Sequence, residues 1–308
     1  MGWFNFSLIS MLQNSSIRSF ERAGLESRMV QVGNEFNGST VHVWVPKGYT
    51  TPPPEKPVVV LIHGFGASSV WQWEGQVKPL LRHFTVIATD LLFHGESTTQ
   101  SPKRTESFQA ETIVLCLRAL GVTKFNVVGT SYGGFVAYRI AQNFPDTVEK
   151  LILSNSAVLM TPEDDRELCK RGGAETNWEL LLPESEETVH RMLRLLFKKS
   201  SFFFLPRFVL RDYINVVHNP NRKEKRELLE ALVIGKEAAP SLMTKVDKDV
   251  LIIWGDNDTI FLPFQAQRIK DYLGERAEMV MLEDAGHASQ IEQAGKWNAL
   301  VIEFFKRK

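Results

Sequence analysis

The sequence predicts an α/β fold: a doubly wound, mostly parallel sheet with an inserted helical cap. The first observation is that short β-rich runs alternate with helical patterns, as they do in sheets built from crossover units. The second is a long stretch without strand patterns, residues 157–247, which interrupts this alternation. Together they place helices on both faces of one sheet and a helical insertion between two of its strands.

Seven runs are predicted to be strands. They cover residues 41–45, 58–64, 84–90, 124–130, 148–155, 249–255 and 277–284. Several are apolar at nearly every position, which is typical of strands covered on both faces, whereas the first run alternates like an antiparallel strand near an edge. Amphipathic stripes between the runs predict helices; they are formed by Ile113, Leu117 and Leu120, by Val136, Ile140 and Phe144, and by Ala266, Ile269 and Leu273.

Residues 157–247 carry helical patterns only, among them "SEETVHRMLRLLFKKS", "RFVLRDYINVV" and "RKEKRELLEALVIG". So long a stretch without strands, between two strands of one sheet, is typical of an inserted subdomain. We therefore expect a core made of residues 40–156 and 248–308, a cap made of 157–247, and an N-terminal segment made of 1–39.

Composition narrows the classes of function. The 308-residue chain has 36 Lys plus Arg and 36 Asp plus Glu, so it has no net charge to attract a polyanion, and nucleic acid is not an expected partner. Its two cysteines, Cys116 and Cys169, are too few for a disulfide framework. Free thiols suit a reducing compartment, so we expect a cytoplasmic protein.

Residues 1–25 begin with an apolar stretch that has no charge before Arg18. The stretch is too short to span a bilayer, and it lacks the basic region and cleavage site of a secretory signal. Two alternatives stay open: a helix packed on the core or cap, or an amphipathic segment that makes peripheral contact with a membrane surface.

The string "NVVGTSYGG" at 126–134 places Ser131 between two glycines. An apolar run precedes this serine, and the helical pattern "GFVAYRIAQNFP" follows it. In that setting a G-x-S-x-G string is informative, because the tight strand-to-helix turn lifts the hydroxyl clear of the sheet. Ser131 is therefore a candidate nucleophile, and the backbone N–H of Tyr132 is a candidate oxyanion donor.

A serine hydroxyl needs a base, and the base needs a carboxylate that orients it. His287, in "EDAGHAS", follows both the serine and a carboxylate-bearing loop. Asp256 and Asp258, in "LIIWGDNDTIF", come directly after an apolar strand, and spacing alone leaves both open as the acid. The glycine-bearing loop "HGFGAS" offers Phe65 as the second backbone donor to the oxyanion.

From about residue 40 to its end, the chain resembles the α/β-hydrolase fold family. The resemblance is carried, in order, by "HGFG", "DLLFHGES", "GTSYGG", "WGDND" and "AGH". It implies a hydrolase with Ser131, Asp258 and His287 as its triad, since the family pattern W-G-x-x-D puts the acid at Asp258. Within the family, the cap is most similar to those of monoacylglycerol-lipase-like and carbon-carbon bond hydrolases.

One position departs from the family pattern D-x-x-G-H-G-x-S, because Phe93 stands where the first glycine is usual. Its bulk is expected either to reshape the pocket floor or to pack under the cap. The family's epoxide hydrolases and haloalkane dehalogenases have an aspartate at the nucleophile position, so Ser131 argues against both activities.

The expected reaction is hydrolysis of a small-molecule carboxylic ester, such as a lipid or another apolar acyl ester. His287 takes the proton of Ser131, Asp258 holds the imidazole, and water then cleaves the acyl-enzyme. The side chains expected to bind the substrate are aromatic; they are Phe65, Trp71, Phe93 and Phe203. No cofactor is expected, and no cluster of Cys or His has the spacing of a metal site.

Two other functions stay open. A carbon-carbon bond hydrolase would use the same serine on a diketone-like acid and would need a cationic clamp, for which Arg207 and Arg211 are candidates. A hydrolase-derived small-molecule receptor would cleave its ligand slowly and signal through a partner. Turnover of simple esters separates such a receptor from an enzyme.

Overall fold

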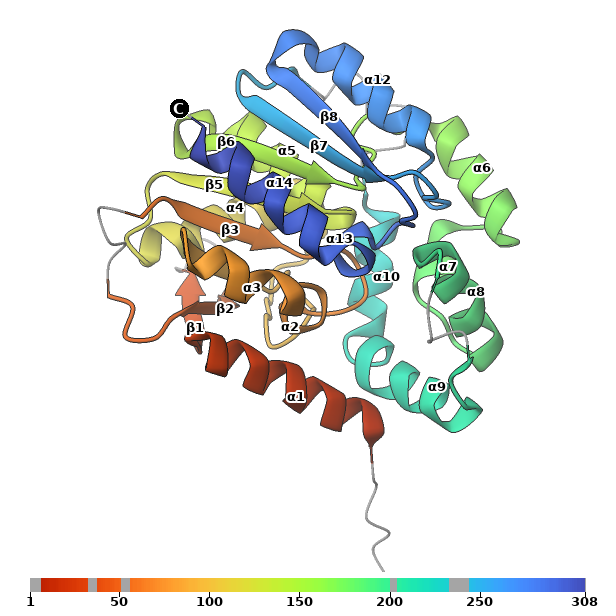
Figure 1. Cartoon of the computed structure of the whole chain (residues 1–308). Coiled ribbons are helices and arrows are strands. Elements are labelled where there is room, and N and C mark those ends of the chain that lie inside the picture. Colours follow the sequence, from red (N-terminus) through yellow and green to blue (C-terminus); the bar gives the residue numbers. More distant parts are fainter. Residues whose placement is uncertain (1–6, 33–37, 51–55, 200–203, 233–243, 308) are drawn as a thin grey trace, which may run out of the picture.

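In the part of the chain that the structure describes, one sheet of eight strands forms the centre of the molecule (Figure 1). The structure is a computed structural model that describes residues 7–32, 38–50, 56–199, 204–232 and 244–307. The strands are β1 (Leu25–Val32), β2 (Ser39–Pro46), β3 (Val58–Ile62), β4 (Thr85–Thr89), β5 (Phe125–Thr130), β6 (Val148–Ser154), β7 (Asp249–Gly255) and β8 (Ala277–Leu282).

The order of the strands across the sheet is β1-β2-β4-β3-β5-β6-β7-β8. β1 pairs with β2, and β2 with β4, in antiparallel fashion. All the other neighbours pair in parallel. The predicted doubly wound, mostly parallel sheet is therefore confirmed.

Helices connect these strands. They are α1 (Leu8–Ala23), α2 (Ser69–Gln72), α3 (Glu74–Leu81), α4 (Glu106–Ala119), α5 (Tyr132–Asn143), α6 (Pro162–Gly172), α7 (Asn177–Leu181), α8 (Glu186–Leu196), α9 (Arg207–Tyr213), α10 (Arg222–Glu230), α12 (Pro263–Leu273), α13 (Ser289–Glu292) and α14 (Ala294–Lys306). Shorter turns are the 3-10 helices η2 (Pro145–Thr147) and η5 (Gly274–Arg276) and the π-helix η4 (Ile214–His218).

The central strand β3 shows how the two faces of the sheet are covered. Successive side chains of a strand point to opposite faces. Val60 and Ile62 accordingly belong to the hydrophobic cluster that includes α4, α5 and α12. Val59 and Leu61 belong to the cluster that includes α1, α3 and α14. A strand buried on both faces is therefore apolar throughout, as the sequence pattern indicated.

Strand β1 is an element that the sequence analysis did not predict. In its sequence, "LESRMVQV", the exposed residues Ser27, Met29 and Gln31 alternate with more buried ones, because successive side chains point to opposite faces and one face is open to solvent at this edge of the sheet. Its register sets Ser27 opposite Trp44 and Met29 opposite His42. The polar residues at its exposed positions hid the strand from a search for apolar runs.

Helix α1 lies between the sheet and the helices inserted after β6. It starts at Ser7, whose side chain caps the helix, and stops at Gly24, which has a φ of 102°. Phe20 packs against Trp44 with ring centroids 5.3 Å apart, and Ile9 packs in a cluster with residues of α9 and η4. The backbone N–H of Ile9 also donates to the carboxylate of Asp212, at 2.8 Å. Helix α1 therefore links the core to the inserted helices.

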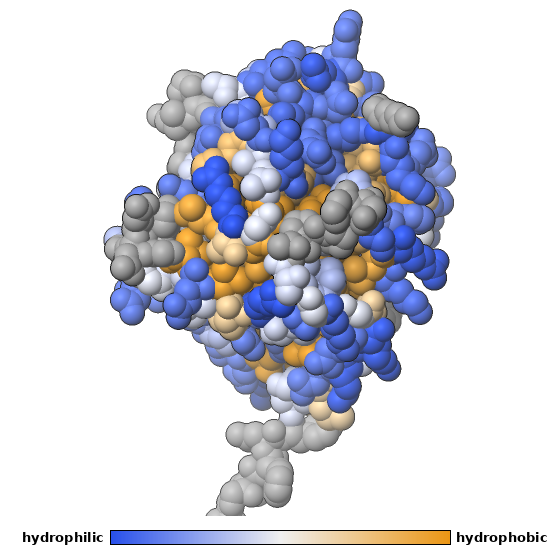
Figure 2. Space-filling model, turned by 90° about the vertical axis from the view of Figure 1, so that its left-hand side faces the viewer, coloured by the Kyte–Doolittle hydropathy of each residue, from blue (hydrophilic) through white to orange (hydrophobic). Residues whose placement is uncertain are grey.

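Helices α6 to α10, which we call the cap, come between β6 and β7 in the chain and lie beyond the carboxyl ends of the parallel strands (Figure 1). Within 157–247, the described residues contain no strand. On the face seen in Figure 2, hydrophilic residues surround a central band of hydrophobic ones. No helix among the described residues is both long and apolar enough to cross a membrane.

Candidate active site

Ser131 occupies the sharp turn between β5 and α5. Its φ of 51° and ψ of −123° lie outside the helical and extended regions, and such strain in a non-glycine residue marks a conformation that the surrounding fold enforces. The N–H of Ser131 donates to the carbonyl oxygen of Ser154 at 3.0 Å. The carbonyl oxygen of Ser131 accepts a hydrogen bond from the hydroxyl of Ser156 at 2.6 Å. These bonds to the neighbouring strand hold the turn in place.

The glycines of "GTSYGG" are there because no side chain fits. A Cβ at Gly129 would lie 2.2 Å from the carbonyl oxygen of Gly133, and one at Gly133 would lie 2.3 Å from that of His63. A Cβ at Gly134 would lie 2.3 Å from the side chain of Ser156. Backbone-to-backbone approach is what brings the start of α5 so close to the sheet.

The structure brings Ser131, His287 and Asp258 together. Nε2 of His287 lies 2.9 Å from Oγ of Ser131, and Nδ1 lies 2.9 Å from Oδ2 of Asp258. His287 is only 4% exposed, and the ring of Phe261 packs edge-on against it. With Nδ1–H donating to the carboxylate, Nε2 is free to accept the proton of the serine hydroxyl.

The two candidate acids differ in what surrounds them. Asp258 is buried and accepts backbone N–H groups from Ile260 and Phe261, each at 2.9 Å, in addition to the bond from His287. Asp256 is exposed and accepts from the backbone of Ala285 and the side chain of its neighbour Asn257. Asp256 thus holds a turn, whereas Asp258 points at the histidine.

Asn155 and Ser289 are site residues that sequence reasoning missed. Nδ2 of Asn155 donates to Oδ2 of Asp258 at 2.8 Å, and its Oδ1 accepts from the hydroxyl of Ser289. Asn155 has a φ of 46° and follows β6 directly, as Asp258 follows β7. Its only sequence signal is a polar residue at the end of a predicted strand, the position where sites in such sheets are built.

The loop proposed to carry the second oxyanion donor passes beside the serine. A Cβ on Gly64 would lie 3.0 Å from Cβ of Ser131, so Phe65 is the next residue along a loop already in contact with the nucleophile. The side chain of Gln72, which sequence analysis missed, fixes this loop by accepting from the N–H of Gly64 at 2.7 Å and donating to its carbonyl at 3.1 Å. Tyr132 is the first residue of α5, so its N–H has no partner within the helix.

Two buried histidines, His63 and His94, hydrogen-bond to the backbone of the same loop. Nδ1 of His63 donates to the carbonyl of Gly64 at 2.7 Å, while its Nε2 accepts the N–H of Leu91 at 3.0 Å. Burial lowers the pKa of His63, and it lowers that of His94 well below the ordinary value. Both imidazoles are therefore neutral at pH 7, and their role here is to position the backbone.

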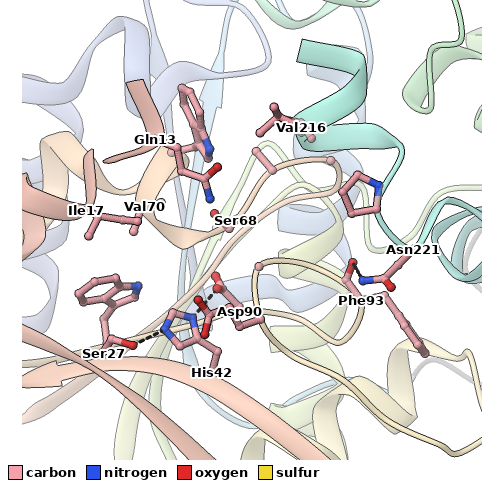
Figure 3. Close-up of a pocket in the computed structure, with 18 of the residues that line it drawn as sticks. Gln13, Ile17, Ser27, His42, Ser68, Val70, Asp90, Phe93, Val216 and Asn221 are labelled. Atoms are coloured by element: carbon pink, nitrogen blue, oxygen red, sulfur yellow. Dashed lines mark hydrogen bonds and ion pairs between the residues drawn. The ribbon is translucent and has the colours of Figure 1, made fainter. Parts of the chain in front are cut away.

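Three of the four residues expected to bind substrate lie in the described part of the chain. Phe65 packs edge-on against Tyr132, with ring centroids 6.1 Å apart. Trp71 and Phe93 line a cavity of about 290 Å³ that opens beside the same loop, and neither Ser131 nor His287 is among its lining residues (Figure 3). Phe203 lies outside the described residues. Substrate contact by these side chains stays a prediction.

Phe93 packs under the cap, which is one of the two roles considered for its bulk. It has a φ of 70°, the left-handed region that the usual glycine adopts without strain. Its ring is buried with Leu228 of α10 in the cap, and the guanidinium of Arg104 lies 4.6 Å from the ring centroid. Phe93 therefore packs under the cap and also lines the cavity.

The cationic candidates for a substrate clamp point to solvent. The side chains of Arg207 and Arg211 are 85% and 71% exposed, and both lie beside the carboxylate of Glu186. Cys116 and Cys169 are buried and free. Within the described ranges, no group of three or more His, Cys, Asp or Glu side chains is arranged to hold a metal ion.

Comparison with known proteins places this arrangement in a family. A model described as alpha/beta hydrolase fold matches residues 57–294. The monoacylglycerol lipase abhd6-A of Xenopus laevis is 30% identical over 264 residues, covering 82% of this chain and 76% of the relative. The human monoacylglycerol lipase ABHD6 is 28% identical over the same length and the same shares of both chains.

Two solved structures show the same fold. A membrane phospholipase A, described as a bacterial virulence factor, has a TM-score of 0.76 at 22% identity, with 96% of this chain and 91% of that chain covered. A 2-hydroxy-6-oxo-6-phenylhexa-2,4-dienoate hydrolase from Rhodococcus sp. strain RHA1 has a TM-score of 0.74 at 21% identity, with 92% and 99% covered.

Proposed function

Because the chain belongs to the alpha/beta hydrolase fold family and is a lipase-like hydrolase, we propose that it cleaves carboxylic esters through an acyl-enzyme on Ser131. The observation that carries the proposal is the unbroken hydrogen-bonded chain from Ser131 through His287 to Asp258, with each link at 2.9 Å. The strained turn under Ser131 presents its hydroxyl at the end of that chain.

In the first half of the reaction, His287 takes the proton of Ser131 while Oγ attacks the ester carbonyl carbon. The proton then passes from the imidazolium to the departing alcohol. Asp258 stabilises the imidazolium and keeps Nε2 facing the serine, because its remaining oxygen is held by the N–H groups of Ile260 and Phe261. In the second half, water replaces the alcohol and the same histidine acts as its base.

Negative charge develops on the carbonyl oxygen, and two backbone N–H groups are proposed to stabilise it. One belongs to Tyr132, at the amino end of α5, where the helix dipole adds to the effect. The other belongs to Phe65, on the loop that Gln72 braces. Removal of one such donor typically costs about 10² to 10³ in kcat.

The substrate we propose is an apolar acyl ester of a small alcohol, of which a monoacylglycerol is the type. Two relatives are monoacylglycerol lipases. Aromatic rings also pack beside the site: Phe65 and Phe135 contact Tyr132, and Phe261 contacts His287. A carbon-carbon bond hydrolase receives less support, because Arg207 and Arg211 are exposed and cannot clamp a buried carboxylate.

A fluorophosphonate probe tests the nucleophile, and a panel of esters tests the pocket. The wild-type protein is expected to take one probe group on Ser131, mapped by peptide mass spectrometry. It is expected to hydrolyse monoacylglycerols of medium or long chain faster than p-nitrophenyl acetate. Labelling of Ser131 without turnover of any ester would contradict the proposed enzymatic function and favour the receptor-like alternative.

We also propose that α1 makes peripheral contact with a lipid surface. Met11 and Leu12 are 51% and 45% exposed on this helix, although large apolar side chains are usually buried. Exposed apolar side chains on a helix whose other face is packed on the protein are suited to the membrane interface.

Liposome sedimentation tests this contact with point variants, because truncation would remove the buried Ile9 and Phe20 as well. The double variant Met11→Ser, Leu12→Ser is expected to lose most of the bound fraction. Phe264→Ser is the matched control, because Phe264 is 51% exposed on α12. Equal binding by the wild type and the double variant would contradict the proposal.

A further inference from the structure

A second serine, histidine and aspartate are hydrogen-bonded in a row outside the site described above. Oγ of Ser27, on β1, lies 2.8 Å from Nε2 of His42, on β2. Nδ1 of His42 lies 2.7 Å from Oδ2 of Asp90, which follows β4. The order of atoms is the same as in the first row, with Nδ1 toward the carboxylate and Nε2 toward the hydroxyl.

Asp90 is held as an oriented anion. It is 2% exposed, and its Oδ1 accepts the N–H of Ser69 at 2.7 Å. Burial would raise the pKa of Asp90, but the hydrogen bond and charge of His42, together with the Ser69 amide, hold that pKa below its ordinary value. The carboxylate therefore fixes His42 with Nδ1–H donating, which leaves Nε2 to accept the proton of Ser27.

All three side chains line the cavity of about 290 Å³ that opens between α1, the loop at 66–71 and the cap (Figure 3). Asp90 and His42 are buried, and Ser27 is an exposed residue on the edge strand. A molecule that enters the cavity can thus reach the hydroxyl of Ser27 without displacing the protein core.

The residue paired with Ser27 across the two strands carries a buried hydrogen-bond donor without a partner in the described part of the chain. Ser27 and Trp44 are directly paired across β1 and β2, so their side chains leave the sheet on the same face. Trp44 also lines the cavity and is 3% exposed, and its Nε1–H has no hydrogen-bond partner among the described residues. Buried indole N–H groups usually find a partner, so this buried N–H is a candidate donor to a ligand that enters the cavity and shifts the ring.

We propose that Ser27 is a second acylation site, which takes the acyl or phosphonyl group of small activated esters that enter this cavity. His42 is its base, Asp90 orients that base, and the Nε1–H of Trp44 donates to the developing oxyanion. The site is independent of the function proposed for Ser131.

The step balances with the groups present. Oγ of Ser27 attacks the carbonyl carbon or phosphorus, and its proton passes to Nε2 of His42. The bond to the leaving group then breaks, and phenolate or fluoride departs with the electron pair. The product is an ester of Ser27, and His42 releases its proton to solvent.

The rate at Ser27 is expected to be lower than that at Ser131. Ser27 lies within a strand, so no helix begins at the next residue, and one indole donor replaces two backbone donors. A loss of one donor corresponds to about 10² to 10³ in rate. We therefore expect slow modification of Ser27, with at most slow turnover.

The test uses full-length Ser131→Ala protein and diisopropyl fluorophosphate, with the modified residue mapped by peptide mass spectrometry. One added group is expected on Ser27, and none in the Ser131→Ala, Ser27→Ala double variant. Adding His42→Gln or Trp44→Phe to Ser131→Ala is expected to slow labelling by at least about tenfold. Trp44→Phe keeps an aromatic ring near Phe20 but removes the N–H together with the second ring of the indole, so the thermal melting temperature of this variant is measured alongside to show whether the lost volume alone disturbs the sheet.

Ser15→Ala is the matched control, since Ser15 is exposed on α1 and is expected to leave the labelling rate as it was. The rate should rise with pH as His42 loses its proton, in a field set by Asp90 and Glu96 and by the cavity residues Glu21 and Lys225. Unmodified Ser27 in a folded Ser131→Ala protein, under conditions that label Ser131 in the wild type, overturns the proposal. Failure to label Ser131 in the wild type bears on the first site only.

Discussion

The two rows of serine, histidine and aspartate have similar hydrogen-bond distances, but the backbone conformation at the serine differs greatly between them. The links are 2.9 and 2.9 Å at Ser131 and 2.8 and 2.7 Å at Ser27. Ser131 has a φ of 51° on a turn that three glycines make room for, whereas Ser27 lies in an antiparallel strand. We therefore expect the backbone that presents the hydroxyl and receives the oxyanion, and not the side-chain distances, to decide which of the two proposed nucleophiles reacts faster.

The two carboxylates, Asp258 and Asp90, also differ in the backbone elements that supply their hydrogen-bond donors. Asp258 accepts from two backbone amides, Asn155 and His287, which all belong to loops at the carboxyl ends of parallel strands. Asp90 accepts from Ser69 and His42, and its histidine comes from the antiparallel edge of the sheet. The residues of the first site come together because parallel strands end at the same edge of the sheet. The second row depends instead on the antiparallel pairing of β1 with β2 and of β2 with β4.

The largest expected contrast is between Ser131→Ala and Ser27→Ala. Loss of the first hydroxyl should lower kcat for a monoacylglycerol by at least about 10⁴, as triad deletions do. Loss of the second should change kcat less than twofold. Steady-state assays of both variants measure the contrast. Comparable losses of kcat in the two variants would mean that the difference in backbone conformation does not affect catalysis.

The two acids near the first site provide the next contrast. Asp258→Asn keeps the shape but lets the imidazole adopt the wrong tautomer, which costs about 10⁴ in kcat in serine hydrolases. Asp256→Asn changes a turn and should leave kcat within about threefold. A larger loss at position 256 would show that the acid has been assigned to the wrong residue.

The turn under Ser131 should be sensitive to a single methyl group. Gly133→Ala places a Cβ against the carbonyls of Ile62 and His63, which we expect to lower the free energy of unfolding by about 1–3 kcal/mol. Gly295→Ala is the control, because nothing lies within 4 Å of a Cβ there and the residue is in α14. Urea titration followed by circular dichroism measures both, and equal stabilities would contradict a crowded turn.

The smallest expected effect is the pH dependence that His42 contributes to stability. Burial alone would lower the pKa of His42, but the hydrogen bond and charge of Asp90 outweigh it and raise that pKa above its ordinary 6.5. The stabilisation is therefore complete below pH 6.5 and is lost as pH rises through the raised pKa of the folded protein.

His42→Gln should accordingly cost more unfolding free energy at pH 5.5 than at pH 8.5, by less than about 1 kcal/mol. The difference between wild type and variant at each pH removes the contribution of the other buried histidines, which both proteins share. A cost that grows with pH would contradict the charged pair.

The sequence was sufficient for the parallel part of the sheet and for much of the first site. Strands covered on both faces must be apolar, and Ser131, Asp258 and His287 follow such strands in an order that the family resemblance interprets. Asn155 and Gln72 were not found, because each acts through a hydrogen bond to a distant residue and carries no motif of its own.

The edge of the sheet was harder for a related reason. β1 is polar on its exposed face, so apolar runs gave no signal for it. The partnership of Ser27 with His42 and Asp90 depends on the register of β1 and β2 and on the crossing to β4. Register is set by pairing in space, and no local pattern in "LESRMVQV" specifies it.

The bond from Ile9 to Asp212 ties the first turn of α1 to α9. Ile9 also packs against Val209 of α9 and Val217 of η4, so a displacement of α1 is expected to be transmitted to these inserted helices. In Figure 1 the C-terminal end of α14 lies on the opposite side of the molecule from α9, so affinity tags and reporter proteins are better joined there.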